Sequence, residues 1–224
     1  MKIEVFRKKL EESKKIESQD INYVLSWLDK ARKKISFSSQ MIPLNEMINW
    51  KVSSQLIAHI SGGFFSINAV RTEAGSLREV SSWDQPIFNQ KEGGILAILC
   101  RIKNSEVQFL IQAKAEPGNI NILQLSPTVQ ATYSNLNRLH NGKPTKYVEY
   151  ILSKKNEVIY SAKHNEEGGR FWRKSNENRL VLSLEDDLTI DKNFYIWLNL
   201  SQLKKLALMD NILSPFVKTI ISPL

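Results

Sequence analysis

The segment from Val107 to Glu116 alternates apolar and polar side chains, and this pattern strongly limits how the chain can fold. One side of the extended segment carries Phe109, Ile111, Ala113 and Ala115. The other side carries Gln108, Leu110, Gln112, Lys114 and Glu116. Successive side chains of a strand point to opposite faces, so the pattern predicts a β-strand with one apolar face. Pro117-Gly118-Asn119 then predicts a turn that ends it.

The polar side of this strand has two interpretations. Neighbours on one face of a strand stand about 7 Å apart, so Lys114 and Glu116 could flank one small ligand. Such a stripe is also what the solvated face of an antiparallel sheet looks like. The spacing leaves both interpretations open.

Composition indicates an ordinary globular protein. The 224 residues are 42% hydrophobic and 24% charged, enough for one good core with an appendage. The formal net charge is +8, but the charges alternate in sign, as in Lys8-Lys9-Leu10-Glu11-Glu12. That alternation favours a solvated helix face over a nucleic-acid surface. We find no apolar stretch of about 18 residues and no signal-peptide pattern, and we expect a cytoplasmic protein without membrane contact.

The expected architecture is α+β. Helices are predicted over residues 1–18 and 20–31, with a short one over 43–50 and a closing one over 201–208. Strands are predicted in 57–70, 95–103, 107–116, 158–162, 179–184 and 194–198, with a hairpin across 104–106. We therefore expect an N-terminal helical arm, 1–42, followed by one domain, 43–224. Cys100, the only cysteine, excludes an intrachain disulfide and is expected in the core.

Several unusual polar segments suggest a family. They are Ile60-Ser-Gly-Gly-Phe-Phe65, Trp83-Asp-Gln-Pro-Ile87 with Gln90, Gln112 to Asn119, Ser126 to Thr132, Ser134-Asn135 and His140. With these segments the chain, from about Pro43 onward, resembles the NDP-hexose 2,3-dehydratases, which act on dTDP-4-keto-6-deoxyglucose in deoxysugar biosynthesis. The resemblance implies a Nudix-like mixed or antiparallel sheet flanked by helices. Family members usually carry two copies of the repeat and this chain shows one, so we expect a homodimer.

No cofactor or metal is expected. The glycines never reach the spacing of a dinucleotide-binding or phosphate-binding loop. Three histidines and one cysteine show no paired spacing for a transition metal, and the carboxylate cluster of Nudix hydrolases is missing. The implied reaction can proceed with side chains alone. It needs a base for the hydrogen on sugar carbon 3, a cation for the enolate oxygen, and an acid for the hydroxide leaving carbon 2.

Four residues are candidates for these roles. Glu116 is the candidate base, although it could equally form a structural ion pair with Lys114. Lys114 would stabilise the enolate or bind the diphosphate, or be a plain surface charge. His140 is the preferred acid because histidine donates protons near neutral pH, although it could instead brace the loop before Gly142. Tyr133 competes with it for the acid role.

The remaining candidates would bind substrate. Trp83 could stack on thymine or pack under the sheet. Neutral donors and acceptors for base, ribose or sugar hydroxyls are Gln85, Gln90, Gln112, Asn119, Thr128, Gln130 and Asn135, and Arg138 adds a positive charge. The segments 166–171 and 176–179 parallel the family only loosely, and we assign them no role.

Three functions remain in order of preference. The first is a sugar-nucleotide 2,3-dehydratase, and the second is a noncatalytic NDP-sugar-binding subunit that supports a partner. The third, a basic nucleic-acid-binding module, is the weakest, and we expect no nucleic-acid partner. Lys114, Glu116 and His140 together favour the enzyme, whereas salt-dependent binding of oligonucleotides would favour the third.

Overall fold

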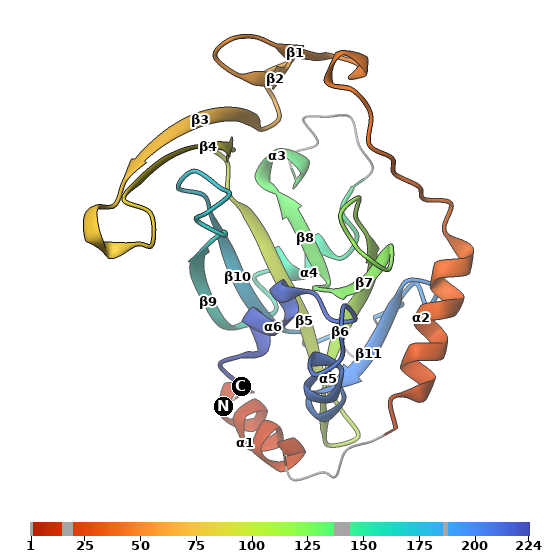
Figure 1. Cartoon of the computed structure of the whole chain (residues 1–224). Helices are drawn as coiled ribbons and strands as arrows, with labels where there is room; N and C mark the ends of the chain where they lie inside the picture. Colours follow the sequence, from red (N-terminus) through yellow and green to blue (C-terminus); the bar gives the residue numbers. More distant parts are fainter. Residues whose placement is uncertain (1, 15–19, 137–143, 186–187) are drawn as a thin grey trace.

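A computed structural model describes residues 2–14, 20–136, 144–185 and 188–224 of the chain (Figure 1). The helices are α1 (Lys2–Lys14), α2 (Asn22–Lys34), α3 (Tyr133–Leu136), α4 (Val148–Leu152), α5 (Leu200–Ala207) and α6 (Pro215–Ile221), with 3-10 turns η1 (Leu44–Glu46) and η2 (Gly75–Leu77). The strands are β1 (Trp50–Val52), β2 (Ile57–His59), β3 (Ser66–Glu73), β4 (Ser82–Asn89), β5 (Gly94–Lys103), β6 (Glu106–Ala115), β7 (Leu123–Ser126), β8 (Val129–Thr132), β9 (Glu157–Asn165), β10 (Ser175–Leu182) and β11 (Tyr195–Asn199).

The strands of the described chain form two sheets. The main sheet has the order β11-β6-β5-β10-β9, with β7 added to β6 and β8 added to β5. β5 is antiparallel to β6 and parallel to β10, so this sheet is mixed. The smaller sheet, β1-β2-β3-β4, is antiparallel throughout and projects away from the main sheet in Figure 1. The predicted α+β class is confirmed.

Helices cover both faces of the main sheet. Apolar side chains of β5 and β6, such as Ile98 and Phe109, form one core cluster with residues of α1, α2, α5 and α6. Leu99 and Leu110 point to the opposite face and pack with Ile151 of α4. Both faces of β6 are therefore buried in the middle of the strand, from Phe109 to Ile111, and its partly exposed polar side chains lie toward the two ends, at Gln108, Gln112 and Lys114. α1 and α2 are part of the main core, a placement that the sequence pattern did not predict.

β5 and β6 diverge from each other and so create a fork in the main sheet. They pair from Leu99 to Lys103 of β5, whereas Gly94 to Ala97 of β5 pair with β8. The last part of β6 pairs with β7 instead. Thr128 lies where the strands separate: its hydroxyl accepts from the Leu99 amide at 2.9 Å and donates to the Leu110 carbonyl. Thr128 is fully buried, so it holds the fork together from within.

The small sheet is attached to the loop between β9 and β10. The Phe88 amide donates to the Arg170 carbonyl, and the Trp172 amide donates to the Phe88 carbonyl, both at 2.8 Å. The rings of Phe88 and Phe171 stack with centroids 5.5 Å apart. These contacts bring residues 166–174 beside the open end of the fork.

The structure agrees with most of the elements expected from the sequence. The strand from Val107 is β6, and the hairpin before it turns through Asn104 and Ser105, both with positive φ. Asp20 accepts from the Asn22 amide at the start of α2. The predicted helix over 43–50 is wrong, because only the 3-10 turn η1 forms there and Trp50 already begins β1. The single strand predicted over 57–70 is also wrong, because β2 ends at His59 and β3 begins only at Ser66. β1, β4, β7, β8, α3, α4 and α6 were not predicted.

Candidate functional site

The fork in the main sheet opens into a small cavity of about 180 Å³, which we call the fork pocket. It is lined by Gly94, Leu96, Lys114, Glu116, Gln130, Ala131, Thr132, Asn135, Glu166, Lys174, Asn176 and Phe216. The charged side chains come from two places far apart in the sequence: the end of β6 and the loop between β9 and β10. Two lysines and two glutamates thus surround a space sized for one small ring.

The first lysine–glutamate pair lies at the end of β6. Lys114 Nζ is 2.6 Å from Glu116 Oε1, and their side chains are 25% and 37% exposed. Gln130 of β8 donates to the same carboxylate oxygen through Nε2 at 2.9 Å. Gln130 Oε1 is buried without a hydrogen-bond partner among the described residues. Buried polar atoms are normally paired, so this amide oxygen is available to accept from a hydroxyl bound in the pocket.

The second lysine–glutamate pair is more enclosed. The Lys174 and Glu166 side chains are only 8% and 14% exposed, with Nζ and Oε1 3.9 Å apart. Lys174 donates to Gln90 Oε1 at 2.6 Å, and Glu166 accepts from Asn176 Nδ2. Lys174 Nζ also lies 5.1 Å from the centre of the Phe171 ring. Burial lowers the pKa of Lys174, although the Glu166 carboxylate acts in the opposite direction.

A larger cavity of about 450 Å³, the tryptophan pocket, adjoins the fork pocket. It is lined by β3 and β4 residues including Trp83 and Gln85, by Arg78, and by the β9–β10 loop including Trp172 and Arg173. Glu166 and Lys174 line both pockets and mark where they meet. The Trp83 indole donates to Gln85 Oε1 at 2.7 Å, and Gln85 Nε2 donates to the Gly169 carbonyl at 2.7 Å.

Arginines face the rings of the tryptophan pocket. The Arg173 guanidinium lies 4.7 Å from the centre of the Trp172 ring, and that of Arg78 lies 5.9 Å from the Trp83 ring. Aromatic faces next to guanidinium groups suit a ligand with a flat base and a negative charge.

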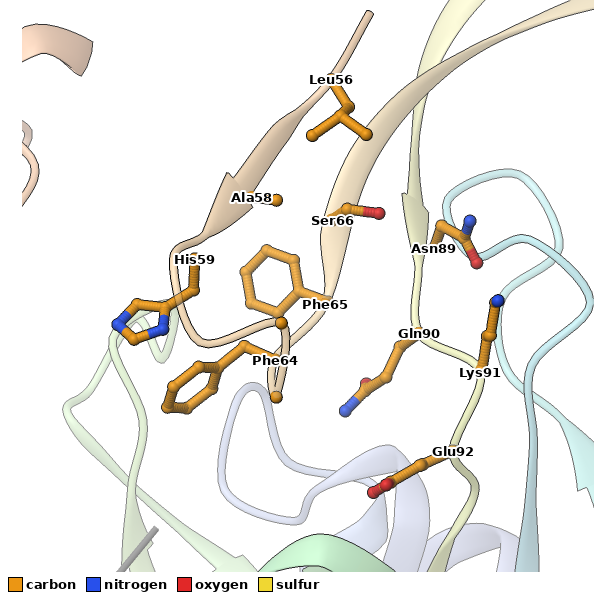
Figure 2. Close-up of a pocket in the computed structure, with 12 residues that line it drawn as sticks. Leu56, Ala58, His59, Phe64, Phe65, Ser66, Asn89, Gln90, Lys91 and Glu92 are labelled. Atoms are coloured by element: carbon orange, nitrogen blue, oxygen red, sulfur yellow. The ribbon is translucent and has the colours of Figure 1, made fainter. Parts of the chain in front are cut away.

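A further cavity of about 410 Å³ lies under the loop between β2 and β3. Figure 2 shows its lining, with His59, Phe64 and Phe65 on one side and Gln90, Lys91 and Glu92 on the other. Its rings belong to an aromatic cluster, in which His59 and Phe64 have centroids 4.6 Å apart. Gln90 connects this cavity to the fork pocket through its bond to Lys174.

The structure brings together a majority of the candidate residues. Lys114, Glu116, Gln130 and Asn135 line the fork pocket. Trp83 and Gln85 line the tryptophan pocket. Gln90 contacts Lys174, where the two pockets meet. His140 and Arg138 lie outside the described residues.

Other candidates have structural partners. The Thr128 hydroxyl forms hydrogen bonds inside the fork. Asn119 Nδ2 donates to the carbonyls of Lys114 and Ile122 and so stabilises its own turn. Gln112 is half-buried between β7 and β11, opposite Ser126 and Tyr195. None of these three lines the fork pocket.

Tyr133 also lies away from the fork pocket. Its hydroxyl is 3.5 Å from Glu177 Oε2. Burial and the Glu177 carboxylate raise the pKa of Tyr133.

Sequence reasoning missed Glu166, Lys174 and Asn176. They come from segments that parallel the family loosely, and no local pattern places them beside β6. The only signal in the sequence was their polarity, near Gly168-Gly169 and in the polar first half of β10.

Comparisons with known proteins agree in pointing to one family. The family model described as NDP-hexose 2,3-dehydratase matches residues 21–224. A dTDP-4-dehydro-6-deoxy-alpha-D-glucopyranose 2,3-dehydratase of Saccharopolyspora spinosa is 37% identical over 199 residues, 88% of this chain and 40% of that protein. One of Amycolatopsis orientalis, with the same name, is 36% identical over 210 residues, 89% of this chain and 43% of that protein.

A solved structure shows a partial likeness. It is the NUDIX domain of Shewanella oneidensis NrtR complexed with ADP ribose, with 12% sequence identity and a TM-score of 0.35, covering 58% of this chain and 85% of that one. The chain spans about two fifths of the length of the curated relatives. On the strength of the family match and these relatives, the chain belongs to the NDP-hexose 2,3-dehydratase family.

Proposed function

We propose that this protein is a sugar-nucleotide 2,3-dehydratase that acts on an NDP-4-keto-6-deoxyhexose, with dTDP-4-keto-6-deoxyglucose as the expected substrate. The observation that carries the proposal is the fork pocket, in which two lysine–glutamate pairs meet beside a cationic, aromatic cavity. The relatives at 36–37% identity are named as dehydratases of this sugar nucleotide.

Charge supports a division of the substrate between the two pockets. Among the described residues, the tryptophan pocket has three cations, Arg78, Arg173 and Lys174, against the single carboxylate of Glu166. That excess suits the diphosphate, and Trp83 can stack on the base. In the fork pocket the charges of two lysines and two glutamates balance, which suits an uncharged sugar.

The neighbouring cavity on the other side of the fork is a poor nucleotide site. It measures about 560 Å³ and is lined by Glu166 and Glu167, and no lysine or arginine belongs to its described lining. A diphosphate there would face carboxylates, which repel it. The cavity under the loop between β2 and β3 is lined by one lysine and one glutamate, so it has no excess of positive charge for a diphosphate.

The chemistry assigned to the fork pocket is an elimination. Glu116 removes the carbon-3 proton, which the ketone at carbon 4 acidifies, and Lys114 stabilises the negative charge on the carbon-4 oxygen. Gln130 fixes the carboxylate through the bond from Nε2 and leaves its own oxygen for a sugar hydroxyl. The elimination gives an enol that tautomerises to a 3,4-diketo-2,6-dideoxy sugar, and no change of oxidation state by a cofactor is needed. The sequence prediction for the acid remains His140, with Tyr133 as the alternative.

A noncatalytic NDP-sugar-binding subunit is the second candidate. One observation favours it: the chain spans about two fifths of the length of the relatives that are named as dehydratases. Both candidates bind dTDP, so the discriminating experiment is turnover. The chain is incubated with dTDP-4-keto-6-deoxyglucose and a 3-ketoreductase, and the products are analysed by mass spectrometry. Loss of water from the sugar supports the dehydratase, whereas binding without loss of water supports the subunit.

We propose that two copies associate as a homodimer in the cytoplasm. In the described part of the chain no helix has the length and apolar character needed to cross a membrane.

A further inference from the structure

Lys174 contributes to the positive charge of the tryptophan pocket, but that charge does not explain why its buried side chain lies between the two pockets. Its side chain is 8% exposed, yet it reaches the boundary between the tryptophan pocket and the fork pocket. Among the described residues, its ammonium has two polar contacts, the Gln90 oxygen at 2.6 Å and Glu166 at 3.9 Å. An ammonium group has three donors, so it retains hydrogen-bonding capacity for a ligand.

The order of atoms in the substrate matches the order of residues along the two pockets. In a nucleoside-diphosphate sugar, the diphosphate is bonded to carbon 1, carbon 2 carries the leaving hydroxyl, and carbons 3 and 4 lie farther on. With the nucleotide in the tryptophan pocket, carbons 1 and 2 fall at the boundary. Lys114 and Glu116 line only the fork pocket, where carbons 3 and 4 would lie.

From this alignment we infer that Lys174 is the catalytic acid that protonates the hydroxyl leaving carbon 2. This inference rests on the proposed function and adds the proton donor to it. Glu166, held by Asn176, faces the ammonium and keeps it directed toward the boundary. The Phe171 ring, with its centre 5.1 Å from Lys174 Nζ, adds an apolar neighbour to the ammonium.

The reaction balances with these residues. Glu116 takes the carbon-3 proton, and the electrons of that C–H bond form the double bond between carbons 3 and 4 with an enolate oxygen at Lys114. The enolate then collapses to a double bond between carbons 2 and 3 while the C2–O bond breaks. Lys174 gives a proton to the departing hydroxide, which leaves as water. Glu116 then returns its proton to carbon 2, and the Lys174 amine takes up the enol proton from the carbon-3 oxygen. These two transfers give the diketone and restore both side chains.

Burial makes Lys174 better suited to this step than an exposed lysine. It lowers the pKa of the ammonium, so the proton is given up more readily than from a lysine in water. The other charged groups that line the fork pocket are Lys114, Glu116 and Glu166. Arg78, Arg173 and Glu166 line the tryptophan pocket together with Lys174.

The test separates two steps in the same chain. Deuterium exchange at carbon 3 reports enolate formation, and mass spectrometry of the sugar reports elimination. Lys174→Arg keeps the positive charge, but its guanidinium does not release a proton. We expect this variant and Lys174→Met to keep carbon-3 exchange and to lose elimination by about 10²- to 10⁴-fold, the range of general acid catalysis. Thermal melting checks that both variants are folded, and a dTDP titration sets the substrate concentration that saturates each of them.

A third variant restores the acid. In Lys174→Cys, alkylation with bromoethylamine rebuilds an ammonium on a sulfur-containing chain, and Cys100, the sole native cysteine, is fully buried and protected. The thioether withdraws electrons, so elimination should return with its alkaline limit shifted to lower pH.

Two outcomes would overturn the inference while leaving the dehydratase intact. In the first, the Lys174→Arg variant eliminates water at a rate within a few-fold of that of the unaltered chain, which would mean that positive charge alone suffices. The other is a His140→Asn variant that loses elimination while Lys174→Met retains it, which would assign the acid to His140. If the unaltered chain neither exchanges carbon 3 nor eliminates water, the proposed function fails and this inference fails with it.

Discussion

At the scale of single residues, Glu116 is the side chain whose chemistry can be tested most cleanly. Its carboxylate contacts Lys114 and Gln130, and a glutamine in its place keeps the shape and loses the base. We expect Glu116→Gln to abolish both carbon-3 exchange and product formation, by about 10²- to 10⁴-fold, while dTDP binding persists. Glu46→Gln, at an exposed position of η1, is the matched control. Normal exchange in Glu116→Gln would remove Glu116 from the role of base and direct attention to Lys114.

The tryptophan pocket gives a second prediction at this scale. If Trp83 stacks on the base, Trp83→Ala should weaken dTDP binding by about 1–3 kcal/mol, the contribution of stacking between a base and an aromatic ring. Trp83→Phe keeps a ring and should recover most of that affinity. Isothermal titration calorimetry with dTDP measures both. Equal affinity in all three proteins would show that Trp83 only packs beneath the small sheet.

The pH dependence of elimination follows from Lys174. The acid must carry its proton, so activity is present below its pKa and is lost as the pH rises through it. Because burial lowers that pKa, the alkaline limit should lie below the pH at which an ordinary lysine titrates. A pH profile of elimination, with carbon-3 exchange followed in parallel, measures this limit. A limit at or above the ordinary lysine value would contradict the expected environment of Lys174.

At the scale of elements, the fork depends on the close approach of β5 and β8. A Cβ atom added at Gly94 would lie 2.5 Å from the Ala131 carbonyl oxygen, a backbone atom that cannot move aside alone. Gly94→Ala should therefore push β8 away from β5 and lower the free energy of unfolding by about 1–3 kcal/mol, as overpacking does. Gly118→Ala, where a Cβ atom has no neighbour within 4 Å, is the control. Urea unfolding of the two variants measures this difference. Equal free energies of unfolding would mean that β8 can move away from β5 without loss of stability.

The elements also show what the sequence could predict. β6 was predictable because ten residues alternate regularly and end at Pro117. β7 (Leu-Gln-Leu-Ser) and β8 (Val-Gln-Ala-Thr) also alternate, but each has only four residues, so the alternation is too short to stand out in the sequence. Those two strands create the fork, and their absence from the prediction hid the shape of the site.

The candidate site was predictable only on one side. Lys114 and Glu116 lie two residues apart on one strand, so their proximity follows from local geometry. Glu166 and Lys174 reach the same pocket because the β9–β10 loop docks on Phe88 of the small sheet. Such a contact depends on tertiary packing, which a local pattern does not contain.

At the scale of the whole molecule, we expect a homodimer with one site per chain. The chain exposes large apolar side chains, including Met41 at 100% and Ile48 at 83% of their accessible area, on the segment that leads into the small sheet. Exposed apolar side chains gathered in one region favour association. Light scattering at micromolar concentration should give twice the chain mass, and a mass of 25.8 kDa would contradict the prediction.

Metal independence is a further expectation for the whole protein, because each step of the proposed elimination is assigned to a side chain of the chain itself. Activity after treatment with EDTA should equal that of the untreated protein. Loss of activity that magnesium or zinc restores would show that a cation takes part in the site.

We propose, above all, that this chain removes water from an NDP-4-keto-6-deoxyhexose between carbons 2 and 3. The most direct measurement is incubation of the chain with dTDP-4-keto-6-deoxyglucose in deuterium oxide, followed by mass spectrometry of the sugar. We expect deuterium at carbon 3 of the recovered substrate, loss of the carbon-2 oxygen as water in the product, and loss of both signals in Glu116→Gln. Tight binding of the sugar nucleotide with neither exchange nor loss of water would contradict it and leave a binding subunit.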